Sequence, residues 1–167
     1  HQVIAHCYKA GIFWQGLFHD LSKYSLTEFV PGAKYYMGDR SPGEAQRKAE
    51  GYSLMWMHHQ GRNKHHYEYW IDYSLDNSGM VGCKMPPNYV AEMMMDRIAA
   101  SKVYNKGKYN HHMPLEYYER GKDSYMIHPE TRALLEFLLR MLDEQGEEVT
   151  FEYIRKNLVG KKDYPKI

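Results

Sequence analysis

The sequence predicts an all-α fold in which residues 1–167 form a single domain, and three observations support this prediction. Apolar residues recur every three or four positions in several segments, which is typical of helices with one buried face. Residues 25–28 and 41–44 carry the polar and proline signals that start helices. No convincing series of alternating apolar and polar residues predicts a sheet.

Four helices are predicted in the first 60 residues. The first covers residues 1–13; His1 lies on its apolar stripe, whereas His6 lies nearer its polar side. The second covers residues 14–24, is strongly apolar and carries His19 and Asp20. The third starts at the capping box of residues 25–28 and reaches about residue 37, with Pro31 favouring a kink or an earlier end. The fourth starts at residues 41–44 and reaches residue 60.

The rest of the chain alternates loops and helices. Residues 61–64 are a polar loop, and residues 71–86 are expected to form a long loop or a short hairpin. A helix from residue 87 to about 104 places Asp96 on its apolar face, and a short helix is expected around residues 115–120. The clearest helix covers residues 129–145 and ends at Gly146, after which Thr150 is expected to cap a last helix through residue 158.

Composition excludes several classes of protein. The chain is 43% hydrophobic and 26% charged with a formal net charge of +1, and it has no long basic run, so no nucleic-acid polymer is expected as a partner. No apolar stretch approaches the roughly 18 residues that would span a bilayer, and no secretory signal is present. A cytoplasmic protein without a membrane partner is therefore expected. Cys7 and Cys83 do not form a disulfide framework.

Histidine is the unusual component, because six of the ten histidines occur as adjacent pairs. Buried imidazole and carboxylate groups are costly unless a partner satisfies them, and a metal ion is one such partner. Together they suit Mn, Fe, Co, Ni or Zn, and the lack of nearby cysteines disfavours a structural zinc site. The candidates for one or two ions are His1, His19, Asp20, His59, His65, His66 and Asp96.

The alternative for each candidate is a role in packing. His19 and Asp20 would also fit a hydrogen-bonded pair in the core, and His59 and His66 a polar cluster lining a cleft. The other histidines are interpreted as non-ligands: His58 as a packing or supporting residue, His111 and His112 as a solvated loop, His128 as the start of a helix and His6 as a surface residue.

The order of these residues resembles that of the HD-domain metal-dependent phosphohydrolases. The stretch HDLSK at residues 19–23 is close to the HDxGK form found there, with Ser22 where that form has glycine. More narrowly, the stretches HDLSKYSLTEF, HHQGRNKHHYEYW and EMMMDRIAASKVY resemble a small branch found in bacteria and their phages, and this resemblance covers roughly residues 1–158.

The resemblance implies an orthogonal helical bundle, HD-domain-like, with a metal site at its centre. His1, His19, Asp20 and Asp96 would bind the first ion. His59, His65 and His66 would complete a second site or contact phosphate. Lys23 would lie beside the phosphate of the substrate, where an ammonium group offers charge and hydrogen-bond donors. Independently of the resemblance, position and charge make Arg62 a second candidate for binding phosphate.

The function expected from this resemblance is metal-dependent phosphohydrolysis of a small phosphorylated molecule, in particular a nucleotide. Metal-bound water would attack phosphorus while Asp20 orients or deprotonates it and Lys23 and Arg62 neutralise the phosphate. The alternatives are a di-iron oxygenase of HD-like fold and a non-catalytic metal- or nucleotide-binding regulatory domain. The aromatic run at residues 67–70 fits either base stacking or the core, and its Glu68 fits either proton transfer or a helix charge. A homodimer is one option for the oligomeric state.

Overall fold

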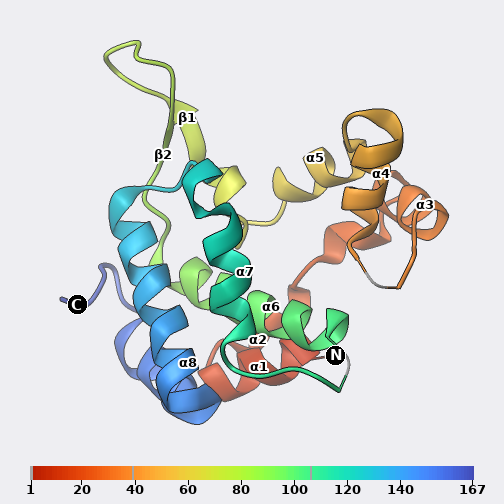
Figure 1. Cartoon of the computed structure of the whole chain (residues 1–167). Coiled ribbons are helices and arrows are strands. Elements are labelled where there is room, and N and C mark those ends of the chain that lie inside the picture. Colours follow the sequence, from red (N-terminus) through yellow and green to blue (C-terminus); the bar gives the residue numbers. More distant parts are fainter. Residues whose placement is uncertain (1, 39, 106) are drawn as a thin grey trace.

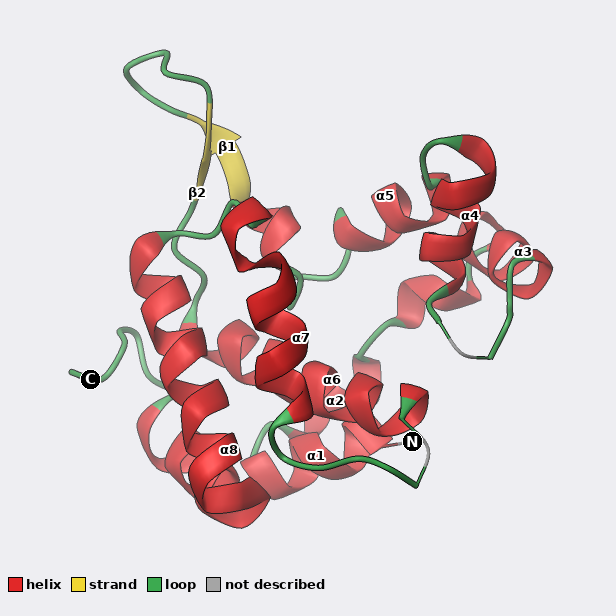
Figure 2. Ribbon diagram, viewed as in Figure 1, coloured by secondary structure: helices red, strands yellow, loops and turns green. Residues whose placement is uncertain are grey.

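The computed structural model describes residues 2–38, 40–105 and 107–167, and helices form nearly all of its regular structure (Figure 1; Figure 2). This confirms the prediction of an all-α fold. In chain order the elements are α1 (Gln2–Ala10), α2 (Phe13–Phe18), η1 (Leu21–Tyr24), α3 (Leu26–Lys34), α4 (Pro42–Glu50), α5 (Leu54–Gln60), η2 (Tyr67–Trp70), β1 (Ile71–Tyr73), β2 (Met80–Gly82), α6 (Pro87–Tyr104), α7 (Met113–Gly121), η3 (Lys122–Ser124) and α8 (Pro129–Asn157).

The helices form two groups with a groove between them. Helices α1, α2, α6, α7 and α8 pack together as the larger group, whereas α3, α4 and α5 lie to one side (Figure 1). The chain crosses between the groups at η1 and again at residues 61–66. The groove has a volume of about 1970 Å³ and is lined by residues of both groups. Side chains at the two crossings are therefore placed at its floor.

The core lies where α6 and α8 pack against each other and against α1. The leucines that predicted the helix at residues 129–145 are all fully buried, which confirms that prediction. Helix α6 is buried on most sides, and this explains why three consecutive methionines, Met93 to Met95, all lie inside. The members that α6 and α8 contribute to the core include Val90, Ala91, Met94, Met95, Ile98, Leu134, Leu135, Leu138, Leu139 and Leu142.

Two helices that the sequence predicted as continuous are interrupted. Helix α2 ends at Phe18 and η1 begins at Leu21, because Asp20 between them adopts the left-handed conformation with φ 59°. The predicted helix of residues 41–60 divides at Gly51, whose φ of 83° ends α4. Helix α5 then starts anew at Ser53, whose hydroxyl accepts a hydrogen bond from the Trp56 amide. Aspartate and glycine tolerate the left-handed region better than most residues, so both breaks are sterically reasonable.

Other element boundaries differ less from expectation. Helix α1 ends before Gly11, and α3 retains Pro31 inside it and ends at Lys34. Residues 71–86 contain a short antiparallel hairpin, which was one of the two expected forms. Gly146 has non-helical backbone angles and kinks α8, as its predicted role as a helix end suggested. The predicted cap at Thr150 is wrong, because its hydroxyl instead donates to the Gly146 carbonyl from inside the helix.

The structure bears on two expectations from composition, one about membrane-spanning segments and one about the two cysteines. No helix in the described ranges is both long and apolar enough to cross a membrane. Cys7 and Cys83 are both free thiols, so neither takes part in a disulfide. Cys7 is fully buried, and this burial raises the pKa of its thiol to about 12. Such a thiol stays protonated and contributes to packing rather than to chemistry.

The prediction that His6 lies on the surface is wrong, because its side chain is buried among α1, α6 and α8. Its Nδ1 lies 3.4 Å from the Met95 carbonyl oxygen, and its Nε2 lies 3.1 Å from the Lys102 ammonium. Lys102 in turn forms a 2.7 Å ion pair with Glu147 of α8. The polar neighbours of His6 within its own helix indicated exposure, but the contacts that bury it come from distant segments.

We expect His6 to make stability depend on pH. Burial, and secondarily the nearby charge of Lys102, lower the pKa of its ring below the ordinary 6.5. The unfolded chain therefore binds a proton at His6 that the folded chain rejects, so His6 lowers the free energy of unfolding as pH falls below 6.5. Urea unfolding at pH 7.5 and at pH 5.5 measures this effect. The loss of stability between the two pH values should be smaller in His6→Gln than in the wild type; an equal loss would contradict the assignment.

Gly16 fixes the approach of α2 to α1, and through it the position of His19. A Cβ at this glycine would lie 2.4 Å from Cys7 Cβ and 2.9 Å from its Sγ. We expect Gly16→Ala to lower the free energy of unfolding by about 1–3 kcal/mol, the usual cost of overpacking. Equilibrium denaturation measures this. The control is Gly32→Ala, because Gly32 is also helical and a Cβ there would meet Met55 Sδ at an ordinary 3.6 Å. A Gly16→Ala variant as stable as the wild type would show that the helices separate easily.

Candidate metal centre

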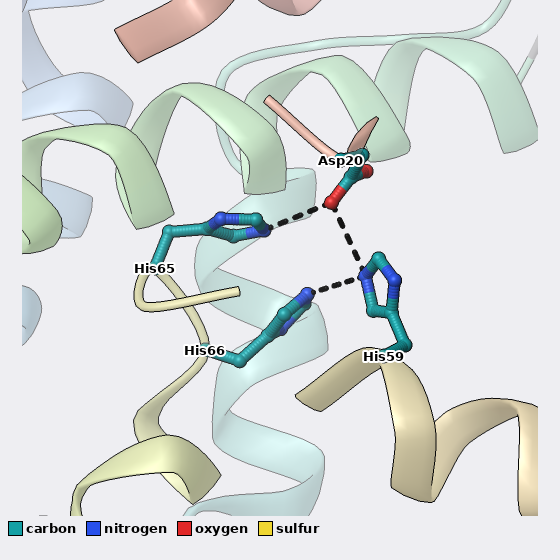
Figure 3. Close-up of side chains that lie close together, drawn as sticks. All are labelled: Asp20, His59, His65 and His66. Carbon is teal, nitrogen blue, oxygen red and sulfur yellow. Dashed lines mark hydrogen bonds and ion pairs between the residues drawn. The ribbon is translucent and has the colours of Figure 1, made fainter. Parts of the chain in front are cut away.

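Asp20 occupies the middle of a cluster of histidines at the floor of the groove. Its Oδ1 lies 3.2 Å from His59 Nε2 and 3.5 Å from His65 Nε2 (Figure 3). His66 joins from the same side, with its Nε2 2.9 Å from His59 Nε2. These four residues come from three places in the chain: the break between α2 and η1, the last turn of α5 and the turn before η2. They could hold a metal ion.

A second group shares His65 with the first and lies on the side of α6. His19 Nε2 is 3.0 Å from Asp20 Oδ2 and 3.4 Å from Asp96 Oδ1. His19, His65 and Asp96 each offer a ligand atom, and these atoms lie within 4.8 Å of one another. The prediction that His19, Asp20 and Asp96 converge is therefore confirmed. The two groups meet at His65, while Asp20 has one carboxylate oxygen on each side.

The atoms at the middle of the cluster are buried and have no hydrogen-bond partner among residues 2–38, 40–105 and 107–167. This is true of His19 Nε2, Asp20 Oδ1 and His65 Nε2, although each lies close to another polar atom. Two ligand atoms that are each about 2.1 Å from an ion lie about 3.0 Å apart at a right angle and about 3.4 Å apart at a tetrahedral angle. The separations of 3.0–3.5 Å around Asp20 match that range. Poor hydrogen-bond geometry at such distances fits a shared ion better than it fits direct bonding.

Glu92 orients two of the histidines and was missed by the sequence interpretation. Its Oε1 lies 3.1 Å from His19 Nδ1 and 3.2 Å from His65 Nδ1, and its Oε2 accepts a 2.8 Å hydrogen bond from Gln15. An Nδ1–H that donates to the carboxylate leaves the Nε2 lone pair of each ring facing Asp20. Glu92 lies four residues before Asp96 on α6, so the helical spacing that selected Asp96 could also have identified it.

Glu28 does the same for the remaining α5 histidines. Its Oε2 lies 2.8 Å from His59 Nδ1 and its Oε1 lies 2.6 Å from His58 Nδ1. The sequence interpretation assigned Glu28 to a capping box, but the Ser25 side chain makes no capping hydrogen bond and Glu28 is buried. Asn63 supports the same ring by donating to the His59 carbonyl and to Ser22 Oγ. His58 is thus a supporting residue, as expected.

The carboxylates of Asp20, Glu92 and Asp96 strongly favour a positive charge inside this cluster. Burial alone would lower the pKa of His19, but Asp20, Asp96 and Glu92 outweigh it and raise that pKa to about 11. Burial likewise opposes ionisation of Asp20, yet His19, His59 and Lys23 hold its pKa well below the ordinary value. A proton on His19 therefore supplies positive charge where a cation would otherwise lie. Metal binding would displace that proton, which is the usual linkage between metal affinity and pH.

The two predicted phosphate ligands lie on different sides of the cluster. Lys23 lines the large groove, and its ammonium lies 2.6 Å from Asp20 Oδ2. Arg62 lines a smaller cleft of about 390 Å³, which Asp20 and His65 also border. Its Nη1 lies 3.5 Å from the His58 carbonyl oxygen. Both cations are near the cluster, but they do not border the same cavity.

The remaining histidine predictions have mixed outcomes. His1, expected as a metal ligand, lies outside the described residues. The adjacent residues His65 and His66 both reach the centre because they lie in a turn, where neighbouring side chains are not held about 100° apart as on a helix. His112 is exposed and pairs with Asp143 at 3.0 Å, and His128 caps α8 by accepting from the Glu130 amide, as expected.

Comparison with known proteins gives a family but no activity. Residues 1–141 match the model of a family described as a family of unknown function (DUF5662). No curated protein and no solved structure matches the chain. The resemblance to HD-domain phosphohydrolases therefore stays a prediction.

Proposed function

The chain belongs to the DUF5662 family, whose function is unknown, and we propose that it is a metal-dependent phosphohydrolase acting on a small phosphorylated molecule, in particular a nucleotide. The observation that carries this proposal is the set of buried ligand atoms of His19, Asp20 and His65 at the floor of an open groove, none of which has a hydrogen-bond partner in the described part of the chain. A closed structural site would not need access from a groove of this size.

The donor set fits a divalent transition metal such as Mn, Fe, Co, Ni or Zn. Imidazole nitrogens and carboxylate oxygens are the ligands these ions share, and no thiolate is among them. When bound, such an ion supplies a water of lowered pKa and a positive charge for a phosphate oxygen. Glu92 and Glu28 would hold the histidine rings in the tautomer that binds metal, which is the role of the supporting carboxylates in many metal sites.

The chain's own residues would then bind and orient the substrate. Asp20 is placed to accept a hydrogen bond from the attacking water and so to orient it. Lys23 lies at the same carboxylate on the groove side, where its ammonium would neutralise the phosphate as charge develops. Arg62 would act on a phosphate oxygen only from the smaller cleft on the other side of Asp20 and His65.

The lining of the groove favours a nucleotide over a small phosphate ester without a base. Aromatic side chains from both helix groups border it, and ring faces can stack on a base. Its volume of about 1970 Å³ exceeds the roughly 300–1,000 Å³ of typical small-molecule pockets, so it has room for a whole nucleotide. Aromatic residues of this lining include Tyr24, Phe29, Tyr36, Trp56, Tyr67, Tyr104, Tyr117 and Tyr125.

A panel of nucleotides and other phosphate esters tests the proposal, with the protein loaded with Mn, Co or Ni and phosphate release as the measurement. We expect turnover of at least one nucleotide that is lost with a chelator and restored by metal. Absence of turnover on every ester would contradict the proposal. Anaerobically purified protein with two bound irons and an absorbance change under oxygen would favour an oxygenase instead. Tight binding of a nucleotide that stays intact would favour a regulatory domain.

A further inference from the structure

Glu68 and Arg97 each carry a buried polar atom that the metal centre does not explain. Glu68 Oε2 and Arg97 Nε have no hydrogen-bond partner among the described residues. Burying such a group without a hydrogen bond is energetically costly, so each is expected to have a partner in the working protein. Both residues line the large groove, where a bound ligand could provide that partner.

The two residues come from elements that also supply the metal centre. Glu68 follows His66 by two positions in η2, and Arg97 follows Asp96 directly in α6. Their side chains are close enough for the charge of Arg97 to act on Glu68, yet no ion pair joins them among the described residues. A direct pair would satisfy both groups, so its absence leaves an acceptor and a donor side by side.

Aromatic rings border the same end of the groove. The Tyr67 and Tyr125 rings lie with their centroids 5.3 Å apart, and both residues line the groove with Glu68 and Arg97. Arg97 itself lies over the Tyr118 ring, with its Cζ 5.8 Å from the centroid. A planar group that enters here would meet ring surfaces on its faces and hydrogen-bonding groups at its edge.

We propose that Glu68 and Arg97 form a subsite that binds the uncharged polar part of the substrate. A hydrogen-bond donor of the ligand would bind Glu68 Oε2, and a neighbouring acceptor of the ligand would bind Arg97 Nε. This inference rests on the proposed function and adds to it how the substrate is oriented: its phosphate at Asp20 and its polar group between η2, α6 and α7. The edge of a nucleobase and the hydroxyls of a sugar share this chemistry, and the tyrosines favour the base.

A phosphate group does not fit this subsite. Phosphate oxygens are acceptors at neutral pH, and the free Glu68 oxygen needs a donor. The Glu68 carboxylate would also repel an anion at short range. The subsite is therefore complementary to a neutral group, whereas the charge of Lys23 beside Asp20 is complementary to the phosphate.

Two variants and two matched controls test the subsite with manganese-loaded protein. Glu68→Gln replaces the free acceptor, and Arg97→Lys removes the Nε donor while keeping the charge. The controls are Glu147→Gln, whose wild-type carboxylate pairs with Lys102 at 2.7 Å, and Arg155→Lys, whose wild-type guanidinium donates to the Lys9 carbonyl; neither residue lines the groove. Titration calorimetry with guanosine, adenosine, uridine, cytidine and ribose 5-phosphate measures binding without requiring turnover. Hydrolysis of the nucleoside monophosphates, of ribose 5-phosphate and of p-nitrophenyl phosphate is measured alongside.

We expect the wild type to bind at least one nucleoside, and each subsite variant to bind it at least tenfold more weakly. With the matching monophosphate, kcat/KM should fall at least tenfold further than with p-nitrophenyl phosphate, whose nitrophenyl group has no hydrogen-bond donor to offer Glu68. Binding of ribose 5-phosphate alone, with the same losses, would assign the subsite to the sugar.

The subsite proposal is contradicted if the wild type binds neither a nucleoside nor ribose 5-phosphate, or if the variants bind these ligands as tightly as the wild type does. It is also wrong if the variants lose all substrates in equal proportion, as they would through damage to the metal centre. If no ester is hydrolysed but a nucleoside binds and the variants lose it, the phosphohydrolase proposal fails while the subsite stands.

Discussion

Replacing Asp20 with asparagine is expected to remove metal from the centre and to lower phosphohydrolase turnover by more than about a hundredfold, beyond the usual effect of losing a supporting residue. Asp20 approaches three histidines and Lys23, so its carboxylate joins the two groups of the cluster. The amide keeps the volume but loses the charge, and its NH₂ group would face either the ring nitrogens or the Lys23 ammonium. Elemental analysis after dialysis against a chelator, together with kcat/KM, measures both effects.

The matched control for this variant is Asp143→Asn. Asp143 also pairs with a histidine, His112 at 3.0 Å, but neither residue of this pair lines the groove. It should retain the wild-type metal content and turnover. If Asp20→Asn holds as much metal as the control after dialysis, the cluster is not a metal centre and the histidines form a polar network instead.

The sequence was sufficient to identify the residues that converge at the cluster, but it was not sufficient to identify the carboxylates that support them. His19, Asp20 and Asp96 stood out because each places a polar group in an apolar segment. Glu28 matched a local capping pattern, and that pattern concealed its contact with His59 of α5. Glu92 lies one helical turn before Asp96 in the same helix, but no local pattern indicated the two histidine rings that it contacts.

The fold shows the same division between local and distant information. Leucine spacing was enough to predict the helix at residues 129–145 because a single buried face determines it. The break at Asp20 had no comparable signal, since residues 14–24 read locally as one apolar helix. That break turns His19 and Asp20 towards side chains from α5 and α6, and only tertiary contacts stabilise it.

Replacing Glu92 with glutamine is expected to weaken metal binding about 10–100-fold without removing any ligand atom. The carboxylate faces Nδ1 of both His19 and His65, so it fixes two ring orientations and two tautomers at once. Glutamine offers a neutral oxygen and an NH₂ group, and the NH₂ group cannot accept from Nδ1–H. It also removes one of the three negative charges that favour a cation at this position. Competition with a chelating dye measures the dissociation constant of the metal.

Glu147→Gln is the control that separates metal affinity from stability. Glu147 is also partly buried and takes part in a polar network, with Lys102 at 2.7 Å, but that network lies at α1 and α8 away from the metal centre. It should lower the free energy of unfolding and leave the metal dissociation constant unchanged. Equal metal affinity in Glu92→Gln and the wild type would show that the histidine rings are held by packing alone, and that the Nε2 atoms face Asp20 without help from the carboxylate.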